Sequence, residues 1–470
     1  MMGGTFALLR WESVNVRRSH LQLSWPEAVR VVTVGRLAMW PRAVVVPILV
    51  ITGLVAASSA QAGPKLSLVS GEGHGFHFVN SVTVDGGENG NDEARGISVA
   101  ADGTVIATGY VTVTGQGRNI WIGKYSEDLV FLDSATVNGV ANGDDEGYTV
   151  AFDPSGNLYL VGYMTMAGEG HDIWLGKFDS DLDLVDSITV AGPDTDHDDG
   201  YGILYDSVSG NLYLAGTVRE PGEGANIWLA IYDTDFELVE AITMNGPVDD
   251  TDKARFLTFD DTRHLFVSGS MTEDLSRDYA IWIGKFEDDL TFVDDVTIDG
   301  PTTEEDKGYG IAFDGVDTIF VTGTMIETGE GYNIWMAKLD TDLTILDQLT
   351  INGPVDGEDV AYLMEVSPSG HLFHTGTYTE DVGGTNIWLA RFSPSIDLEA
   401  WVTLDGPAGG YDTGIGVAVG NENNLYVSAI VSDPVEGFNM WIGRFDLPLI
   451  FVDGFETGNT IAWSDAVVSP

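Results

Sequence analysis

Residues 119–125 read Asn-Ile-Trp-Ile-Gly-Lys-Tyr, and residues 172–178 repeat the pattern as Asp-Ile-Trp-Leu-Gly-Lys-Phe. The Trp of this stretch occurs in seven copies, with 53 or 54 residues between successive copies. Such regular spacing indicates one structural unit repeated in tandem with almost no insertions. Apolar β-forming residues dominate each copy and Gly- or Asp-rich turns bound it, so each copy is predicted to be a strand. The seven residues are Trp121, Trp174, Trp228, Trp282, Trp335, Trp388 and Trp441.

One complete unit can be read from residue 130 to residue 182. An acidic loop occupies 138–147, and the Pro-Ser-Gly-Asn sequence at 154–157 favours a tight turn. No stretch has helical periodicity. Four-stranded sheets repeated roughly four to eight times are typical of β-propellers, so the chain is predicted to be an all-β, seven-bladed β-propeller with four antiparallel strands per blade. The strands predicted for this unit cover 130–137, 148–153, 158–164 and 172–178.

The order of these strands is similar to that of a known group of proteins. A strand such as 310–314, a turn, a strand such as 157–162 and the Trp-containing strand follow one another in each unit. Over residues 76–446 this succession resembles secreted bacterial β-propeller repeat proteins. The resemblance implies that strands like 310–314 are innermost and strands like 184–189 outermost. Residues 76–84 would then be the outermost strand of a blade completed by 415–445, with 449–453 as a rival for that position.

The balance of charge excludes one class of partner. The formal net charge is −52, and residues 63–470 contain 15 basic and 71 acidic side chains. Nucleic acid is therefore not expected as a partner, because its recognition needs a basic surface. The chain has no Cys, so neither a disulfide nor a thiol nucleophile is available. A solvated, self-repelling surface of this kind keeps a protein soluble, and we expect a monomer.

The two ends of the chain have patterns of export. Residues 1–62 are predicted to contain a signal peptide, because Arg42 precedes an apolar run at 43–57 and Ala60-Gln61-Ala62 provides small residues for cleavage. Translation from Met39 would give this signal ordinary proportions. We therefore expect a secreted or cell-surface protein, periplasmic or extracellular, with no transmembrane segment after cleavage. Residues 63–75 are interpreted as a linker, 76–446 as the propeller, and 447–470 as a C-terminal tail similar to a motif on other secreted bacterial proteins.

The loop before each predicted inner strand has an Asp at one equivalent position in all seven copies. In a propeller these carboxylates form a ring near the axis on one face. The structural interpretation is that each Asp accepts backbone N–H bonds and fixes its loop. The alternative is a site for a hard cation such as Ca²⁺, the only cofactor considered. We expect the first to dominate. The candidate metal ligands are Asp92, Asp145, Asp198, Asp252, Asp306, Asp359 and Asp412.

Three further sets of residues have structural interpretations. The Trp residues are expected to fill the core between blades. The basic residues that follow them in the repeat, Lys124 being the first, are expected to form ion pairs with acids of the outer strand such as Asp133. His171 and His197 lie in loops of different blades and could meet on one face, but nothing in the sequence supports them as a pair. His371 and His374 are expected on opposite faces of a strand.

No catalytic motif can be recognised in the sequence, and the blades are nearly uniform in length. The first hypothesis is a secreted or surface-displayed, non-enzymatic propeller that serves as a binding or interaction scaffold for a protein or glycan ligand. The alternative is a secreted, glycosidase-like hydrolase that uses carboxylates on the acidic loop face. An active site usually needs one or two long, unique loops, and the constant spacing of the repeats leaves no room for them, so the first hypothesis is preferred.

Overall fold

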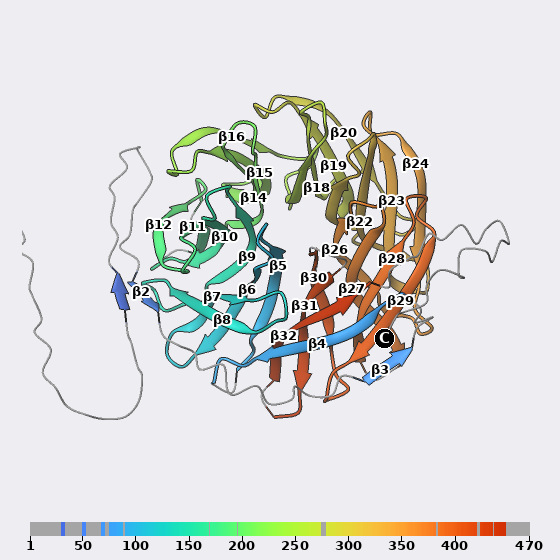
Figure 1. The fold of residues 1–470 in the computed structure, drawn as a ribbon. Helices are drawn as coiled ribbons and strands as arrows, with labels where there is room; N and C mark the ends of the chain where they lie inside the picture. Colours follow the sequence, from blue (N-terminus) through green and yellow to red (C-terminus); the bar gives the residue numbers. More distant parts are fainter. Residues whose placement is uncertain are drawn as a thin grey trace, which may run out of the picture.

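The computed structural model describes residues 75–447, except 88–89, 169, 195, 274–278, 382–383, 421–423 and 436, together with three short strands closer to the N-terminus. The fold class is confirmed: seven sheets of four antiparallel strands surround a central axis (Figure 1). The described part of the chain contains no helical stretch with the length and apolar character that a membrane span requires.

Each blade runs from an inner strand at the axis to an outer strand at the rim. Blades 1 and 2 contain β5 (Glu93–Val99), β6 (Val105–Val113), β7 (Gly117–Tyr125), β8 (Phe131–Asn138), β9 (Glu146–Phe152), β10 (Leu158–Thr165), β11 (His171–Phe178) and β12 (Leu184–Val190). Blades 3 and 4 contain β13 (Asp199–Tyr205), β14 (Leu212–Glu220), β15 (Gly224–Tyr232), β16 (Leu238–Met244), β17 (Lys253–Phe259), β18 (Leu265–Thr272), β19 (Tyr279–Phe286) and β20 (Phe292–Ile298). Blades 5 and 6 contain β21 (Lys307–Phe313), β22 (Thr318–Glu327), β23 (Gly331–Asp340), β24 (Ile345–Ile351), β26 (Val360–Val366), β27 (Leu372–Asp381), β28 (Gly384–Phe392) and β29 (Leu398–Asp405).

Blade 7 combines the two ends of the propeller. It contains β30 (Thr413–Val419), β31 (Asn424–Asp433), β32 (Gly437–Asp446) and, as its outer strand, β4 (His77–Val84). β4 lies beside β32 (Figure 1), and the register places Trp441 opposite Thr83. Closure by the N-terminal strand is therefore confirmed, whereas the rival segment 449–453 lies outside the described residues. Four short strands extend these sheets: β1 (Arg30–Val32), β2 (Leu49–Thr52), β3 (Ser67–Ser70) and β25 (Gly357–Glu358). β2 pairs with the outer strand β8 and β1 with β2, β3 pairs with the outer strand β29, and β25 pairs in parallel with β23.

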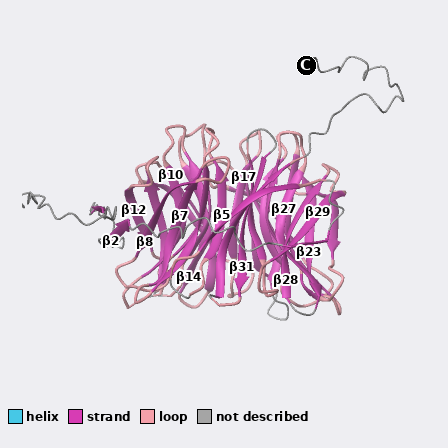
Figure 2. Cartoon of the chain, turned by 60° about the horizontal axis from the view of Figure 1, so that its bottom comes forward, coloured by secondary structure: helices cyan, strands magenta, loops and turns pink. Residues whose placement is uncertain are grey.

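The strands run between two faces of loops, which Figure 2 shows at the two ends of the molecule. We call the face with the seven Asp-containing loops the loop face, and the opposite one, with the tight turns, the turn face. The apolar core lies between blades. In one of its clusters Ile120 and Ile122 of blade 1 pack with Leu160 and Trp174 of blade 2. All seven repeat Trp side chains are buried, so their predicted role in the core is confirmed.

Two predictions about local structure need correction. The inner strand of blade 2 begins at Glu146, two residues before the predicted start, so the acidic loop is shorter than expected. Lys124 is opposite Asp133 in the register, as expected, but its ammonium group donates to the carbonyl of Ser180 in the next blade, at 2.6 Å. The Asp133 carboxylate accepts the N–H of Ser134 instead. The expected ion pair within the blade is therefore wrong for Lys124.

Candidate functional site: the axial ring

The seven repeated Asp residues join neighbouring blades. All seven are fully buried. Asp252 accepts the N–H of Gly246 at 2.5 Å and that of Thr272 at 2.8 Å, and its own N–H donates to the carbonyl of Ala225, at 2.6 Å, on the third strand of blade 3. The same three bonds occur at every junction, including the closure, where the N–H of Asp92 donates to Phe438. The backbone N–H bonds that the structural interpretation predicts are thus present.

These carboxylates resist ionisation in their buried positions. Burial raises the pKa of Asp252 to about 6, against the two backbone N–H groups, which favour the charged form. The same balance raises the pKa of Asp145 to about 7 and that of Asp359 to about 6. The described residues include no group of three or more His, Asp or Glu side chains placed to hold one metal ion. Binding of Ca²⁺ by the ring of Asp residues stays an untested prediction.

A β-bulge interrupts every inner strand close to the loop face. Between β17 and β18, Ala254 pairs with Gly269 and Phe256 with Ser268, so Arg255 has no residue opposite it in the strand register. An extra residue of this kind re-aims its side chain. In blade 5 the irregularity covers Gly310 as well as the equivalent residue. The residues at this position, which we call the axial ring, are Arg95, Tyr148, Tyr201, Arg255, Tyr309, Tyr362 and Ile415.

A Gly in the second strand permits each of six bulges. A Cβ added to Gly269 would lie 1.8 Å from the carbonyl oxygen of Lys253, and one added to Gly162 would lie 2.0 Å from that of Glu146. At these positions a Gly allows the inner strand to approach this closely. In blade 7 the equivalent residue is Ala429. Six of the seven copies of the repeat therefore encode the bulge by a Gly in the middle of an otherwise apolar strand.

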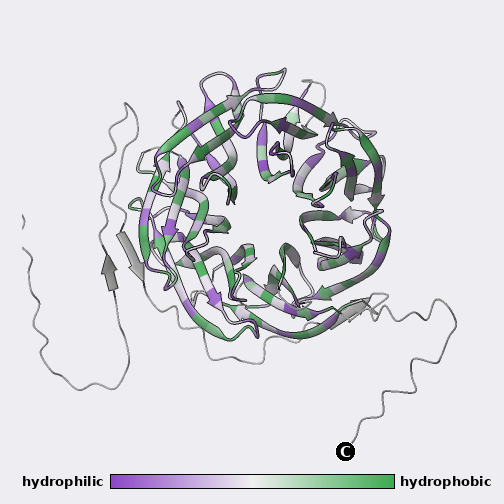
Figure 3. Ribbon diagram, turned by 45° about the horizontal axis from the view of Figure 1, so that its top comes forward, coloured by the Kyte–Doolittle hydropathy of each residue, from purple (hydrophilic) through white to green (hydrophobic). Residues whose placement is uncertain are grey.

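Members of the axial ring contact one another from blade to blade. The ring centroids of Tyr148 and Tyr201 are 5.2 Å apart, and those of Tyr309 and Tyr362 are 5.0 Å apart. The guanidinium carbon of Arg255 lies 5.3 Å from the ring centroid of Tyr201 and 4.6 Å from that of Tyr309. Equivalent residues of successive blades meet in this way only on the inside of the propeller, around the axis that Figure 3 views. Their side chains are partly exposed.

A charged network surrounds the axial ring in blades 1 and 2. Arg95 contacts Glu93 and Glu146, each at 3.0 Å, and Arg118 contacts Glu146 at 2.5 Å. Burial opposes ionisation of Glu146, but Arg95 foremost, then Tyr163 and Arg118, outweigh it and lower the pKa of Glu146. Glu146 is therefore held as a carboxylate between two guanidinium groups.

The network continues into blade 3 through two histidines. The ring of His171 stacks on those of Tyr163 and His197, with centroid distances of 3.9 and 4.1 Å. Its Nε2 lies 2.8 Å from Asp199, which also accepts the hydroxyl of Tyr201 at 3.0 Å. Burial opposes ionisation of Asp199, but these bonds and the His171 ring lower its pKa. The structure thus brings His171 and His197 together, which nothing in the sequence supported.

The cations that blades 4 and 5 place near the axial ring differ in whether they form ion pairs. Lys307 forms an ion pair with Glu305. Within the described part of the chain, neither Lys253 nor Arg255 has an ion-pair partner, and the Nε of Arg255 is buried without a hydrogen bond. Burial first, and then repulsion by Arg255, lowers the pKa of Lys253 to about 8. Asp199 and Glu305 attract Lys253 without contacting it, and among the described residues no acid forms an ion pair with Lys253 or Arg255.

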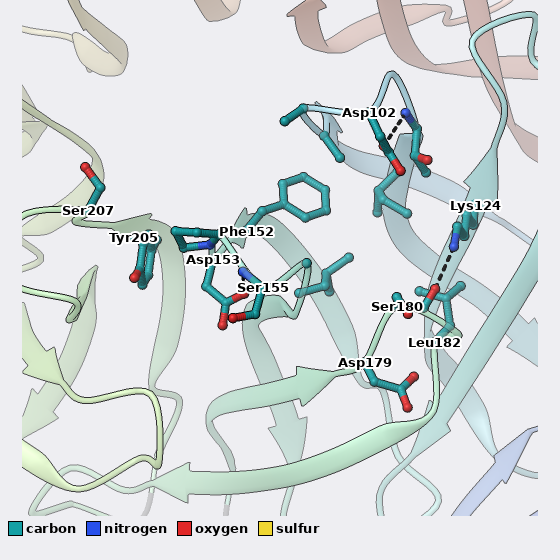
Figure 4. A pocket seen from close by; sticks show the side chains of 17 residues that line it. Asp102, Lys124, Phe152, Asp153, Ser155, Asp179, Ser180, Leu182, Tyr205 and Ser207 are labelled. Atoms are coloured by element: carbon teal, nitrogen blue, oxygen red, sulfur yellow. Dashed lines mark hydrogen bonds between the residues drawn. The ribbon is translucent and has the colours of Figure 1, made fainter.

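The basic residues of the third strands have a structural role instead. Lys177 donates to Thr234 at 2.9 Å and Arg444 to Glu127 at 3.1 Å, each in the following blade. Arg391 differs, since it pairs at 2.9 Å with Glu399 of its own outer strand. On the turn face, Lys124 and Ser180 both line a cavity of about 520 Å³. Figure 4 shows the hydrogen bond between Lys124 and Ser180 at this cavity. Apart from Arg391, these cations join neighbouring blades.

The two histidines of blade 6 are separated as expected. His371 pairs with Glu399 at 3.3 Å, whereas His374 is fully buried and packs on Trp388 and Phe392. Neither ring nitrogen of His374 has a hydrogen-bond partner within the described residues. Burial lowers its pKa to about 3, so His374 is neutral.

Comparisons with known proteins give no function. The sequence matches no protein family and no curated protein. The propeller domain of the trilobed protease from Pyrococcus furiosus aligns at 13% identity with a TM-score of 0.44, covering 77% of this chain and 98% of that one. A protein of unknown function from Dyadobacter fermentans aligns at 9% identity with a TM-score of 0.45, covering 80% and 100%. An acylaminoacyl peptidase aligns at 10% identity with a TM-score of 0.43, covering 76% and 52%. At such values no activity is transferred to this chain.

Proposed function

We propose that the chain is a secreted or surface-displayed, non-enzymatic propeller that binds a protein or glycan ligand at the loop-face end of its axis, through the axial ring. One observation supports this most: the bulged position carries different chemistry in different blades, while the Trp and Asp positions are the same in all seven. The bulges direct two Arg and four Tyr side chains toward one place. Convergent aromatic and charged groups are typical of binding sites.

The chemistry of the nearby carboxylates favours binding over hydrolysis. A glycosidase needs one carboxyl group whose pKa is raised enough to donate a proton. Glu146 and Asp199, which lie at the axial ring, both have lowered pKa values because of their cationic or hydrogen-bonding neighbours. A carboxylate held ionised in this way accepts hydrogen bonds from a ligand and does not donate protons. Asp145 beside Glu146 has a pKa raised to about 7, but it is fully buried and bound to backbone N–H groups, so it does not reach a substrate. The alternative is a hydrolase that uses carboxylates on the loop face.

Export is part of the proposal and is tested separately. It is supported by the apolar run at 43–57 and the small residues Ala60 and Ala62. Mass spectrometry of protein recovered outside the cytoplasm should give an N-terminus at Gly63. Recovery of exported protein with residues 1–62 intact would contradict this step without affecting the binding site.

The binding proposal is tested by an array screen with matched variants. The chain from Gly63 is applied to glycan and protein arrays, and each ligand found is titrated against Tyr148→Ala/Tyr362→Ala and against the control Tyr205→Ala. Tyr205 lies at the turn-face end of an inner strand. We expect at least a tenfold loss of affinity in the axial variant and none in the control. Equal affinity of all three proteins would place the ligand elsewhere.

The chain from Gly63 is also used to test the alternative, a hydrolase. Chromogenic glycosides and fluorogenic peptides are incubated with the chain between pH 5 and pH 8. The proposal expects no turnover above buffer. Turnover abolished by Glu146→Gln would replace the binding function with hydrolysis at the same face.

A further inference from the structure

The cations of this protein are few, and most have a partner. Residues 63–470 contain 15 Lys and Arg side chains against 71 acidic ones. Of the cations on the third strands, Lys285 donates to Thr341 at 2.7 Å and Lys338 to Pro394 at 3.1 Å. On the turn face Arg263 contacts Asp206 at 2.7 Å. Among the described residues, a cation with neither an ion pair nor a hydrogen bond to a carbonyl oxygen is the exception that requires an explanation.

Two such cations are neighbours at the axis. Lys253 begins the inner strand of blade 4, and Arg255 is its bulged residue. Arg95 occupies the equivalent position in blade 1, where Glu93 and Glu146 neutralise it. No acid takes that role for Arg255 among the residues described. Arg95 therefore belongs to an ion-pair network, whereas Arg255, at the equivalent position of blade 4, forms no ion pair among the described residues.

The surroundings of Arg255 offer no hydrogen-bond acceptor to its Nε. Tyr201 and Tyr309 flank the guanidinium group and stabilise its charge through their ring faces. Aromatic rings do not accept the directed N–H bonds of a guanidinium, and its Nε remains without an acceptor. A buried donor without an acceptor costs free energy. An oxyanion satisfies the guanidinium group through two parallel N–H bonds, which is the geometry that Arg favours.

We propose that Arg255 and Lys253 bind an oxyanion, a carboxylate or a phosphate group, of a small organic ligand, with Tyr201 and Tyr309 beside its body. The partial exposure of these four side chains allows contact from the axis. Repulsion between the two cations in the free protein, which contributes to the lowered pKa of Lys253, is relieved when the anion is present. This inference rests on the proposed function, because it takes the axial ring as the place where a ligand binds.

Two anionic sugars distinguish the sources of the oxyanion. Glucuronate presents a carboxylate and glucose 6-phosphate a phosphate, and glucose is the neutral control. Each is titrated calorimetrically into the chain from Gly63 at constant ionic strength. We expect a dissociation constant on the order of 1 mM or lower for at least one anionic sugar, and no heat with glucose. No binding of either anion, or equal binding of glucose, would overturn the proposal.

Variants show whether Arg255 and Lys253 bind the anion or only stabilise the fold. Arg255→Gln and Lys253→Met should each weaken the anion at least tenfold, whereas Lys124→Gln on the turn face should not. Without ligand, Lys253→Met should keep or raise the melting temperature, since it removes repulsion and no ion pair. A lower melting temperature with unchanged anion affinity would make Lys253 structural and the proposal wrong. An array ligand lost in Tyr148→Ala/Tyr362→Ala but kept in Lys253→Met would leave the proposed function intact and refute this inference alone.

Discussion

Asp252→Asn provides a quantitative test of the buried carboxylates between blades. Burial raises the pKa of Asp252 from 3.8 to about 6 in the folded protein. A raised acid pKa means that the folded state binds the proton more tightly than the unfolded state. Stability attributable to this group therefore increases as pH falls through the folded pKa, and the gain is complete below the unfolded pKa.

The magnitude follows from the two pKa values. Between pH 8 and pH 5 a single carboxyl with these values adds about 1.4 kcal/mol to the free energy of unfolding. Asn cannot titrate, so Asp252→Asn loses this increment. The variant should also be less stable at every pH, by about 1–3 kcal/mol, since its amide cannot accept both N–H groups now bound by the carboxylate. The destabilisation relative to wild type should thus be about 1.4 kcal/mol greater at pH 5 than at pH 8.

The assay is urea unfolding followed by Trp fluorescence at pH 5, 6, 7 and 8, with the slope of each transition checked for constancy. Asp261→Asn is the matched control, because Asp261 is exposed on a turn. The control should leave the pH dependence of wild type unchanged. If Asp252→Asn shows the same pH dependence as wild type, the carboxylate is not desolvated enough to shift its titration, and the reasoning fails.

Three further predictions concern other parts of the fold. His374→Val should raise the free energy of unfolding by about 1–3 kcal/mol at pH 8, because it removes two unsatisfied ring nitrogens, and by about 2 kcal/mol more at pH 5. Urea unfolding at both pH values measures this, and a loss of stability at both would contradict it. Deletion of 63–85 should open the ring and cause aggregation seen by light scattering, whereas deletion of 454–470 should not; the reverse pattern would assign closure to the tail. Ca²⁺ at ~5 mM should raise the melting temperature no more than Mg²⁺ does. A Ca²⁺-specific increase that Asp198→Asn abolishes would make the Asp ring a metal site.

The parts of the fold that repeat could be predicted from the sequence. A period of 53 or 54 residues identifies the blade, and the seven Asp residues stand out because they occur in every copy. Closure by residues 77–84 was expected from the strand order that the resemblance implies, with 449–453 as a rival in the same repeat register, and the structure pairs 77–84 with the strand of Trp441. These features depend on spacing along the chain, which a sequence displays directly.

Features that depend on contacts between blades could not be predicted in the same way. Lys124 was assigned to Asp133 because the two strands are adjacent, but the long side chain reaches Ser180 of the next blade. The two histidines of the loop face, His171 and His197, are 26 residues apart and meet because the start of β11 lies beside the loop that precedes blade 3. Distances of this kind depend on the angle between blades, for which the sequence carries no local signal.

The axial ring could have been predicted in part. The sequence marks its bulges by a Gly in the second strand, but this Gly interrupts the strand pattern instead of following it. The Gly in the middle of the second strand, such as Gly162 or Gly269, marks the bulge in six copies. A reading of strands by alternation places Tyr148 at the start of a strand, whereas the structure makes it the extra residue in a strand that begins at Glu146. Recognition of the bulge would have aligned Tyr148 with Arg95 and Arg255 as one set facing the axis.

Ile415 bears on what the axial residues are for. It occupies the bulged position of blade 7, where the register shift is the same as in blade 1, so the bulge itself requires neither a charge nor an aromatic ring. The blades are already joined by the buried Asp bonds and by the Trp-containing core, which are present in all seven. Backbone geometry and blade packing are therefore satisfied without Arg or Tyr at the axis. Arg95 is balanced by acids of its own and the next blade, but Arg255 has no such balance among the described residues, and its charge in a chain this acidic is explained most simply by an anion that comes from outside.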